Sequence, residues 1–412
     1  MRVAQQFFTV LTVVAFHLAS AADNPPALPQ TSPGVAYTNV VVPEVPWSLQ
    51  VVQISRARGL YEIQSRHAGP GALGLATLSA QVLAAATDAR EPVAAINGGF
   101  FLRETGQTNA YAGFPRGLQI VEGEVLSAPA GNTCLWLDYA GQPHADNVAS
   151  QFEITWPDGR KTPFELNGPR PDSGIELYTP AVGSSTHTAG GRELVLEPQP
   201  GGPWLPLRLG RDYPARVREI RSAGNTPLTP DTMVLSLGPT RLQELAQLTP
   251  GTLVRISTQS LPDLRGARNA LSGGPVLVRN GRSQRNRAAP DAPYEFSTML
   301  ERHPRTAFGW NDRSFFLVQV DGRQKDLSLG MTLDELSDFL LKLGCTDAMN
   351  LDGGGSSSLW FDGRVRNNPC DGYERSIANA LLVLRKQPPA GGDNSRSKSA
   401  EAALEKGRQN GN

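Results

Sequence analysis

The sequence predicts an α+β protein, a single large domain whose core is a mostly antiparallel or mixed β-sheet with a few packed helices. Short apolar segments separated by Gly and Pro recur along the chain, and residues 143–260 show almost no helical periodicity. Residues 305–310 and 314–320, joined by Asn-Asp-Arg, give a strong hairpin signal. Clear helical patterns are few, and the best lies at 332–343, where Thr332-Leu-Asp-Glu335 predicts a capping box at the start of the helix.

The first 21 residues have the three parts of a secretory signal: a basic residue, an apolar run and small residues at the cleavage point. The apolar run is too short for a stable membrane anchor, and no later stretch reaches that length. We therefore expect a soluble protein without a membrane span, exported to the periplasm or the extracellular space.

The domain organisation follows from changes in composition. Residues 22–45 are rich in Pro, Ala and Thr and are expected to form an extended leader, with structure starting near Trp47. Residues 46–386 form the predicted domain, including the β-rich middle region 143–260. Residues 387–412 are polar and rich in Gly, and we expect a disordered tail.

The elements can be placed in chain order. Alternating polarity predicts a half-buried strand at 47–54, and an Ala- and Leu-rich segment predicts a helix at 77–86. Strands follow at 93–97 and, with a tight turn, at 115–124. The middle region contains short strands at 151–156, 176–179, 193–197, 217–221, 233–237 and 254–258, and one helical pattern at 241–248. A glycine turn and strand at 270–281 precede the hairpin, and the last core strand is expected at 376–384.

The charges exclude some partners and give no sign of a metal. The chain has 39 basic and 39 acidic residues, so the totals do not favour nucleic acid or an anionic membrane. The five histidines are scattered and have no metal-ligand spacing. We expect no required cofactor, although paired Asp and Asn oxygens could hold a hard divalent cation.

The three cysteines fall in different settings. Cys345 and Cys370 bracket a Gly-Ser loop, and in an oxidising compartment a disulfide between them would close that loop. Cys134 lies in an apolar strand pattern and is expected to be a buried free thiol.

The stretch DAMNLDGGGSSSLWFDG at 347–363 concentrates backbone freedom beside an ionisable group. A buried strand pattern ends at Asp352, and three glycines and three serines follow, so successive amides can converge on an anion. A flexible linker is the competing interpretation, but apolar residues flank the loop on both sides, which is unusual for a linker. No Lys follows the glycines and no G-x-S-x-G is present, which disfavours a nucleotide hydrolase and a serine esterase.

Further polar residues follow apolar strands. Closing the hairpin at Asn-Asp-Arg places Arg305 and Asp321 at the same end of the sheet, with Arg323 just beyond. Asn97 and the loop 371–375 have the same character. Asp362-Gly363 is interpreted as an ordinary turn.

In this order the motifs resemble the phosphodiester glycosidase family. They are AINGGFF (95–101), SGGP (272–275), HPRTAFG (303–309), VDGR (320–323), NLDGGGSS (350–357), NPCDGYER (368–375) and ANA (378–380). The resemblance covers about residues 46–386. Cys370, Cys345 and Ser376-Ile377 depart from the family pattern; the two cysteines fit a pair that arose together, and the changes leave the carboxylates and arginines untouched.

The resemblance implies hydrolysis of a sugar-1-phosphodiester at the sugar–oxygen bond, in a cell-envelope or extracellular glycopolymer. That reaction needs a carboxylate near the sugar ring and cations or amides near the phosphate. Asp352 is the first choice for the carboxylate, with Asp321 or Glu374 as a second acid/base. The phosphate would be held by Arg305, Arg323 and the amides of Gly353, Gly354 and Gly355. The residues expected to orient or complete the substrate site are Asn97, Ser356, Ser357, Thr306, Asp371 and Arg375.

Two other functions remain open at this point. One is a non-catalytic carbohydrate- or phosphate-binding envelope protein on the same scaffold. The other is an ordinary phosphodiesterase that cuts the P–O bond.

Overall fold

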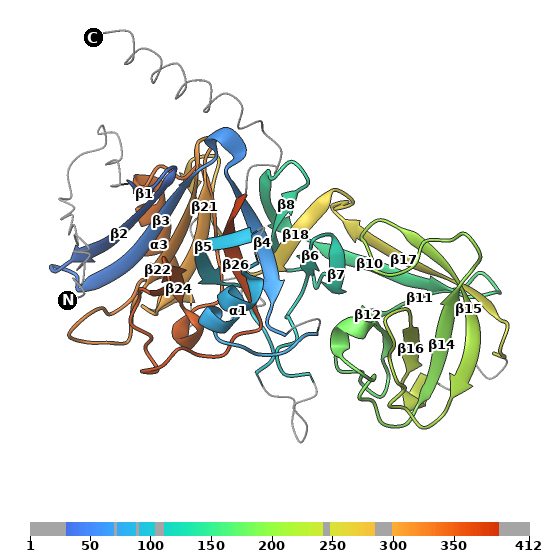
Figure 1. Ribbon diagram of the computed structural model, residues 1–412. Helices are drawn as coiled ribbons and strands as arrows, with labels where there is room; N and C mark the ends of the chain where they lie inside the picture. Colours follow the sequence, from blue (N-terminus) through green and yellow to red (C-terminus); the bar gives the residue numbers. More distant parts are fainter. Residues whose placement is uncertain are drawn as a thin grey trace, which may run out of the picture.

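A computed structural model of the protein describes residues 30–69, 72–87, 90–103, 111–241, 248–284 and 299–386. The signal predicted at 1–21, the tail at 387–412 and most of the helical pattern at 241–248 lie outside these residues. The described chain forms four β-sheets, with helices α1 (Leu78–Ala85) and α3 (Leu333–Lys342) packed on them (Figure 1). The predicted sheet core with few helices is therefore confirmed. Among the helices described, none combines the length and apolar character needed to cross a membrane.

The first sheet has eight strands in the order β1-β2-β3-β22-β21-β23-β19-β20. It begins before Trp47, because residues in the expected leader pair along the whole of β3. No strand was predicted at residues 35–42, because the Pro- and Ala-rich composition of residues 22–45 indicated an extended leader. The bounds are β1 Gln30–Ser32, β2 Val35–Val42, β3 Trp47–Ser55, β19 Val276–Arg279, β20 Arg282–Ser283, β21 Arg305–Trp310, β22 Ser314–Val320 and β23 Asp347–Asn350.

The predicted hairpin is the centre of this sheet. Strands β21 and β22 are antiparallel, and Arg305 pairs with Val320. Arg305 and Asp321 therefore lie at the same end of the sheet, as the turn position predicted. Every residue of both strands is buried, which explains their nearly continuous apolar sequence.

The two helices cover sheet faces. Thr332 caps α3: its hydroxyl accepts the Glu335 N–H at 3.1 Å, and the Glu335 carboxylate accepts the Thr332 N–H at 2.9 Å, so the predicted capping box is confirmed. The apolar side of α3 packs with the first sheet in one core cluster that includes Leu336 and Leu340. Helix α1 packs on the second sheet through Leu78 and Val82.

The second sheet has the order β25-β24-β5-β26-β4. The last core strand of the chain, predicted at 376–384, lies between two strands from the N-terminal part. Apolar residues of the first three sheets meet in one core, among them Ile54, Ile96 and Leu317. The bounds are β4 Tyr61–His67, β5 Arg90–Asn97, β24 Leu359–Phe361, β25 Arg364–Val365 and β26 Asn379–Lys386.

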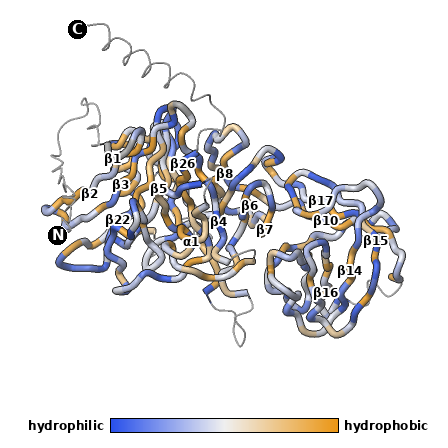
Figure 2. Tube along the Cα trace, viewed as in Figure 1, coloured by the Kyte–Doolittle hydropathy of each residue, from blue (hydrophilic) through white to orange (hydrophobic). Residues whose placement is uncertain are grey.

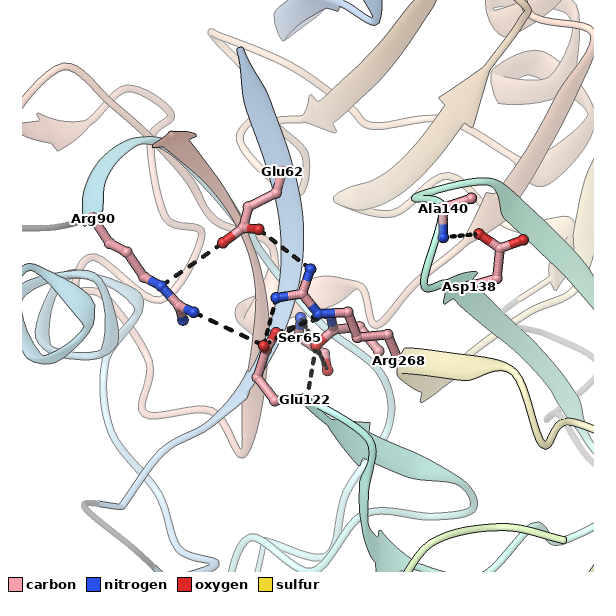
Figure 3. Close-up of polar contacts among 8 residues, drawn as sticks. Glu62, Ser65, Arg90, Glu122, Asp138, Ala140 and Arg268 are labelled. Carbon is pink, nitrogen blue, oxygen red and sulfur yellow. Dashed lines mark hydrogen bonds and ion pairs between the residues drawn. The ribbon is translucent and has the colours of Figure 1, made fainter. Parts of the chain in front are cut away.

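The third sheet, β7-β6-β18-β8-β9, joins the second through charged side chains. Arg268 on β18 lies between two carboxylates, 2.6 Å from Glu122 and 3.4 Å from Glu62, and Arg90 approaches both at 3.9 Å (Figure 3). Burial raises the pKa of Glu122, but its bonds with Arg268 and Asn269 hold the value below normal. The bounds are β6 Gln119–Val121, β7 Glu124–Ser127, β8 Thr133–Asp138, β9 Pro143–Asn147 and β18 Ala267–Ser272.

The middle region forms the fourth sheet, in the order β11-β10-β17-β15-β14-β16-β13-β12, to one side of the others (Figure 1). Its apolar residues follow the strands, as the orange segments of Figure 2 show, and Leu196, Leu235 and Ile256 belong to its core. The bounds are β10 Ala149–Thr155, β11 Lys161–Pro163, β12 Glu165–Leu166, β13 Ile175–Tyr178, β14 Arg192–Pro198, β15 Asp212–Arg221, β16 Met233–Leu237 and β17 Leu253–Leu261.

The disulfide predicted between Cys345 and Cys370 is wrong, because both thiols are free. Cys345 is buried in the apolar cluster beneath α3, with its Sγ against the backbone of Gly309. Cys370 lies in a polar loop, its Sγ 3.6 Å from Asp371 Oδ1. Between Cys345 and Cys370 the chain leaves the first sheet and joins the second, so the short distance between them in sequence does not bring the thiols together. Cys134 is a buried free thiol, as predicted.

Candidate functional site

A cavity of about 230 Å³ lies where the ends of β21 and β23 meet the glycine loop. It brings together Arg305, Arg323 and Asp352, three residues that the sequence placed in separate motifs. The cavity is also lined by Phe100, Gly274, Pro275, Met299, His303, Leu333, Asn350, Leu351, Gly353, Gly354, Gly355 and Arg375. Acidic, cationic and apolar groups therefore share one small space.

Asp352 is the one carboxylate among the described residues that line this cavity. Burial raises its pKa to about 6, although hydrogen bonds from Ser356 and the Gly353 N–H and the charge of Arg375 act in the opposite direction. The Gly353 N–H lies 2.9 Å from Oδ1. Near neutral pH this carboxyl group is mostly ionised, yet close enough to its pKa to exchange a proton.

The backbone of Asp352 is fixed by Asn97 at the end of β5. The Asn97 amide Nδ2 donates to the Asp352 carbonyl at 2.7 Å, and its Oδ1 accepts both the Thr306 hydroxyl at 2.7 Å and the Ser358 N–H at 3.0 Å. Asn97 and Thr306 are almost fully buried. Both were expected to contact substrate; instead, their polar atoms join β5, β21 and the glycine loop behind the cavity.

Of the three arginines that line the cavity, Arg305 and Arg323 are close enough for their charges to interact. Arg305 is 6% exposed and donates Nε to the Met331 carbonyl and Nη2 to the Glu301 carbonyl, each at 2.9 Å. Burial, together with the charge of Arg323, lowers the pKa of Arg305 to about 10. The group remains protonated at neutral pH, and an anion between the two cations would relieve their repulsion.

His303 orients the second cation. Its Nδ1 lies 3.3 Å from Arg323 Nε, which must be the donor because arginine has no acceptor. That contact places the ring proton on Nε2, which faces the Glu301 carboxylate at 3.4 Å. Burial and the neighbouring arginines lower the pKa of His303. The ring is therefore neutral at physiological pH and holds the guanidinium as a hydrogen-bond acceptor.

The glycines permit close approach of the arginines. Gly354 has a φ of +61°, and a Cβ there would lie 3.2 Å from the Arg323 guanidinium. A Cβ at Gly355 would lie 1.9 Å from Arg375 Nη2, so a side chain there would displace the Arg375 guanidinium from its present position. Arg375 is held by Asp371, whose Oδ2 accepts Nη2 at 2.6 Å and Nε at 3.0 Å.

The loop offers fewer free donors than the sequence suggested. The Gly353 N–H is bound to Asp352 Oδ1, and the Gly354 N–H donates to the Pro304 carbonyl at 2.9 Å. Ser356 is buried and bonds the Asp352 carboxylate. Ser357 is also buried, and its Oγ has no partner among the described residues. The predicted amide cradle is thus partly used to hold the loop and Asp352.

The two carboxylates proposed as second acid/base do not line the cavity. Asp321 is 1% exposed and accepts hydrogen bonds from Ser48 Oγ at 3.0 Å, Gln319 Nε2 at 3.3 Å and the Asn368 N–H at 3.0 Å. Burial raises its pKa despite these bonds. Glu374 accepts the Ser79 N–H at 2.6 Å in the first turn of α1.

Sequence reasoning did not single out Asn350, and it noted that His303, near Arg305, could line a site but favoured a structural or exposed role for it; both residues line the cavity. Asn350 Nδ2 donates to the carbonyls of Gly274 at 2.9 Å and Leu351 at 2.8 Å, while its buried Oδ1 has no partner among the described residues. A buried oxygen without a hydrogen-bond partner can accept a hydrogen bond from a hydroxyl or amide N–H of a ligand. Both residues lie inside motifs quoted above, within two positions of Asp352 and Arg305, and that spacing was the available signal.

No group of three or more His, Cys, Asp or Glu residues that could hold a metal ion occurs in the described part of the chain. The cavity itself combines one carboxylate with three arginines. Such a set matches an anionic ligand better than a divalent cation.

The sequence comparisons cover the cavity. Residues 216–384 match the family model described as phosphodiester glycosidase. Human N-acetylglucosamine-1-phosphodiester alpha-N-acetylglucosaminidase is 30% identical over 228 residues, 47% of this chain and 44% of the human protein. The matched segments span less than half of each curated relative's own length.

Two solved structures share the fold. A hypothetical protein from Synechocystis has a TM-score of 0.68 at 22% identity, over 86% of this chain and 63% of that one. A protein from Burkholderia pseudomallei has a TM-score of 0.62 at 22% identity, over 85% and 75%. The chain therefore resembles the phosphodiester glycosidase family, as its motifs predicted, and residues 216–384, which contain Arg305, Arg323 and Asp352, carry the match.

Proposed function

We propose that this protein is an exported hydrolase that cleaves the sugar–oxygen bond of a sugar-1-phosphodiester. The observation that carries the proposal is the cavity itself, in which a carboxyl group with a pKa of about 6 faces the same space as Arg305, Arg323 and Arg375. The family match and the activity for which the human relative is named support the same reaction class.

The arginines suit the phosphate half of the substrate. Breaking the bond moves an electron pair onto the phosphate oxygen, so negative charge grows on the departing group. Arg305 is fixed by two backbone carbonyls and Arg323 by His303, so both cations are oriented before substrate arrives. Preorganised charge of this kind stabilises the transition state more than a mobile side chain would.

Asp352 suits the sugar half. As the phosphate leaves, positive charge develops on the anomeric carbon, and an ionised carboxylate stabilises it or attacks it. A water supplies the oxygen that remains on the sugar; its proton passes to the carboxylate and on to solvent, and the products are a free sugar and a phosphomonoester. The hydrogen bond from Asn97 Nδ2 to the Asp352 carbonyl holds the backbone of Asp352 in place, whether the carboxylate stabilises the positive charge or attacks the anomeric carbon.

A second acid is less necessary here than for an ordinary glycoside, because phosphate is a good leaving group. Asp321 and Glu374 have hydrogen-bond partners outside the cavity. We infer that Asp321 fixes residue 368 and the loop that follows it, and that Glu374 fixes the start of α1. Arg375, between these loops, is held in the cavity by Asp371.

The substrate class is proposed to be a phosphodiester-linked glycopolymer of the cell envelope or extracellular space. The supporting observation is the signal-like sequence at residues 1–21. Export can be tested separately from catalysis by N-terminal sequencing of the mature protein, which should begin near Ala22 or Asp23.

The test of catalysis uses methyl phosphodiesters of N-acetylglucosamine-1-phosphate and glucose-1-phosphate. Reducing sugar and phosphomonoester should appear in equal amounts, and in heavy-oxygen water the label should enter the sugar. Label in the phosphate would instead identify a phosphodiesterase. Saturable binding of these diesters without product would favour a binding protein and contradict the proposal.

A matched pair of variants tests the role of Asp352. Asp352→Asn should fold normally and lose at least about 3 kcal/mol of transition-state stabilisation. Asp362→Asn is the control, because Asp362 also precedes a glycine but is exposed in a turn, with 82% of its side chain accessible. Near-normal turnover in Asp352→Asn would exclude Asp352 from the chemistry.

A further inference from the structure

A second cavity of about 380 Å³ lies between the β8–β9 hairpin and the first sheet. The side chains that give it its character are Trp136, His144, Asp146, Arg279, Trp310 and Asp347. Its volume lies within the roughly 300–1,000 Å³ typical of small-molecule sites. None of these residues takes part in the proposed reaction.

Aromatic rings form the apolar surface of this groove. Trp136 and His144 face each other in the register of the hairpin, and their rings stack with centroids 5.2 Å apart and planes inclined by 16°. Trp310, at the end of β21, contributes a second indole. Neither indole N–H donates a hydrogen bond to another described residue, and Trp310 is 7% exposed, so Trp136 is the more accessible of the two rings. The stack holds the Trp136 ring in one orientation, as a binding platform requires.

Polar groups complete the groove. Arg279 on β19 donates Nη2 to the Ala145 carbonyl at 3.0 Å and lies 3.7 Å from Asp146 Oδ1, so it connects the first sheet to the hairpin. Asp347, at the start of β23, accepts the Asn280 N–H through Oδ1 at 3.2 Å. Its second oxygen makes no hydrogen bond with any described residue and can accept one from a ligand.

This composition matches a neutral sugar ring. A sugar presents C–H groups on its faces, which pack on the negative face of an indole, and hydroxyl groups on its rim, which bond carboxylates and guanidinium groups. Two carboxylates against one arginine make the groove unfavourable for phosphate. The candidate site has the opposite balance, with three arginines and one carboxylate.

The two cavities share strands. Asp347 and Asn350 are the first and last residues of β23; Asp347 lines the groove and Asn350 lines the candidate site. Side chains three residues apart on a strand point to opposite faces of the sheet, and Arg305 and Trp310 are likewise the first and last residues of β21, so the groove and the candidate site use opposite ends of the same strands. Pro275, which precedes β19, lines the site, and Val276, the first residue of β19, lines the groove.

We propose that this groove is a second sugar-binding site, separate from the candidate site, that holds a neutral sugar residue of the glycan. The groove itself binds unphosphorylated sugar, and this property does not depend on turnover in the candidate site. If the protein does not hydrolyse the phosphodiesters, the sugar-binding test still applies. If no sugar binds in the groove, the hydrolysis test still applies.

The experiment titrates the mature protein with maltotriose, cellotriose and N,N′-diacetylchitobiose, using ligand-observed NMR and intrinsic tryptophan fluorescence. At least one of these should bind with a dissociation constant in the millimolar range or tighter. Trp136→Ala should weaken that binding by about tenfold, because it removes the stacking platform. Trp204→Ala is the matched control, because Trp204 lies outside both cavities and bonds the Asp231 carbonyl through its own indole N–H at 2.7 Å.

Two further variants keep the test decisive. Asp347→Asn keeps an oxygen that can accept the Asn280 N–H but removes the negative charge, so it should also weaken sugar binding. This variant takes the place of Trp136→Ala in the test if Trp136→Ala does not fold. Asp352→Asn should leave binding unchanged. The proposal fails if none of the three oligosaccharides binds, or if binding survives the groove variants and is lost with Asp352→Asn, which would place the sugar in the candidate site.

Discussion

Replacing Asp352 by Asn should stabilise the protein at neutral and alkaline pH while removing its activity. Burial raises the pKa of this carboxyl from 3.8 to about 6 in the folded chain. A shift of about 2 units corresponds to about 3 kcal/mol, which is the cost of holding the ionised form in the fold well above pH 6. An amide has no such cost, and its oxygen can still accept the Gly353 N–H.

The sign of the effect sets the pH window. A folded pKa above the unfolded value means that the stabilising contribution of the protonated group is complete below about pH 4 and disappears as the pH rises through 6. The variant should therefore gain up to about 3 kcal/mol over the parent protein at pH 8 and little at pH 4. Active-site groups often carry this kind of conflict between stability and function.

Urea denaturation at pH 4, 6 and 8 measures the difference in the free energy of unfolding, with equal m-values as a check on two-state behaviour. Asp362→Asn provides the baseline, because it makes the same change from a carboxylate to an amide at an exposed turn position. A stability difference for Asp352→Asn that is the same at all three pH values would refute the argument, since it would mean that the carboxyl has an ordinary pKa in the fold.

Three other predictions follow from the site. If an ionised Asp352 is needed, kcat/KM for a sugar-1-phosphodiester should rise with pH through an apparent pKa of about 6; a flat profile between pH 5 and 8 would exclude the requirement. Arg323→Gln should lower kcat/KM by roughly 10- to 150-fold, which corresponds to the loss of a charged hydrogen bond worth about 1.5–3 kcal/mol. The control is Arg313→Gln in the exposed hairpin turn, which should have little effect. Equal losses in the two variants would argue against a phosphate contact at Arg323. Because Cys345 and Cys370 are free thiols, a reducing agent or the Cys370→Ser change should leave the melting temperature almost unchanged; a loss of the 2–4 kcal/mol typical of a disulfide would show that the bridge forms.

The sequence determined the features that depend on local patterns. The capping box at Thr332, the hairpin that brings Arg305 beside Asp321, and the glycine loop after Asp352 could all be predicted, because each is encoded within a few neighbouring residues. The order of the motifs also indicated the family.

The tertiary structure decided which of these residues share a cavity. Asn97 ends β5 and Arg305 begins β21, but only Arg305 lines the cavity, because the Asn97 amide bonds the backbone of Asp352. Cys345 and Cys370 are close in sequence but separated by a change of sheet. Such outcomes depend on contacts between strands far apart in the chain, and local sequence patterns carry no information about them.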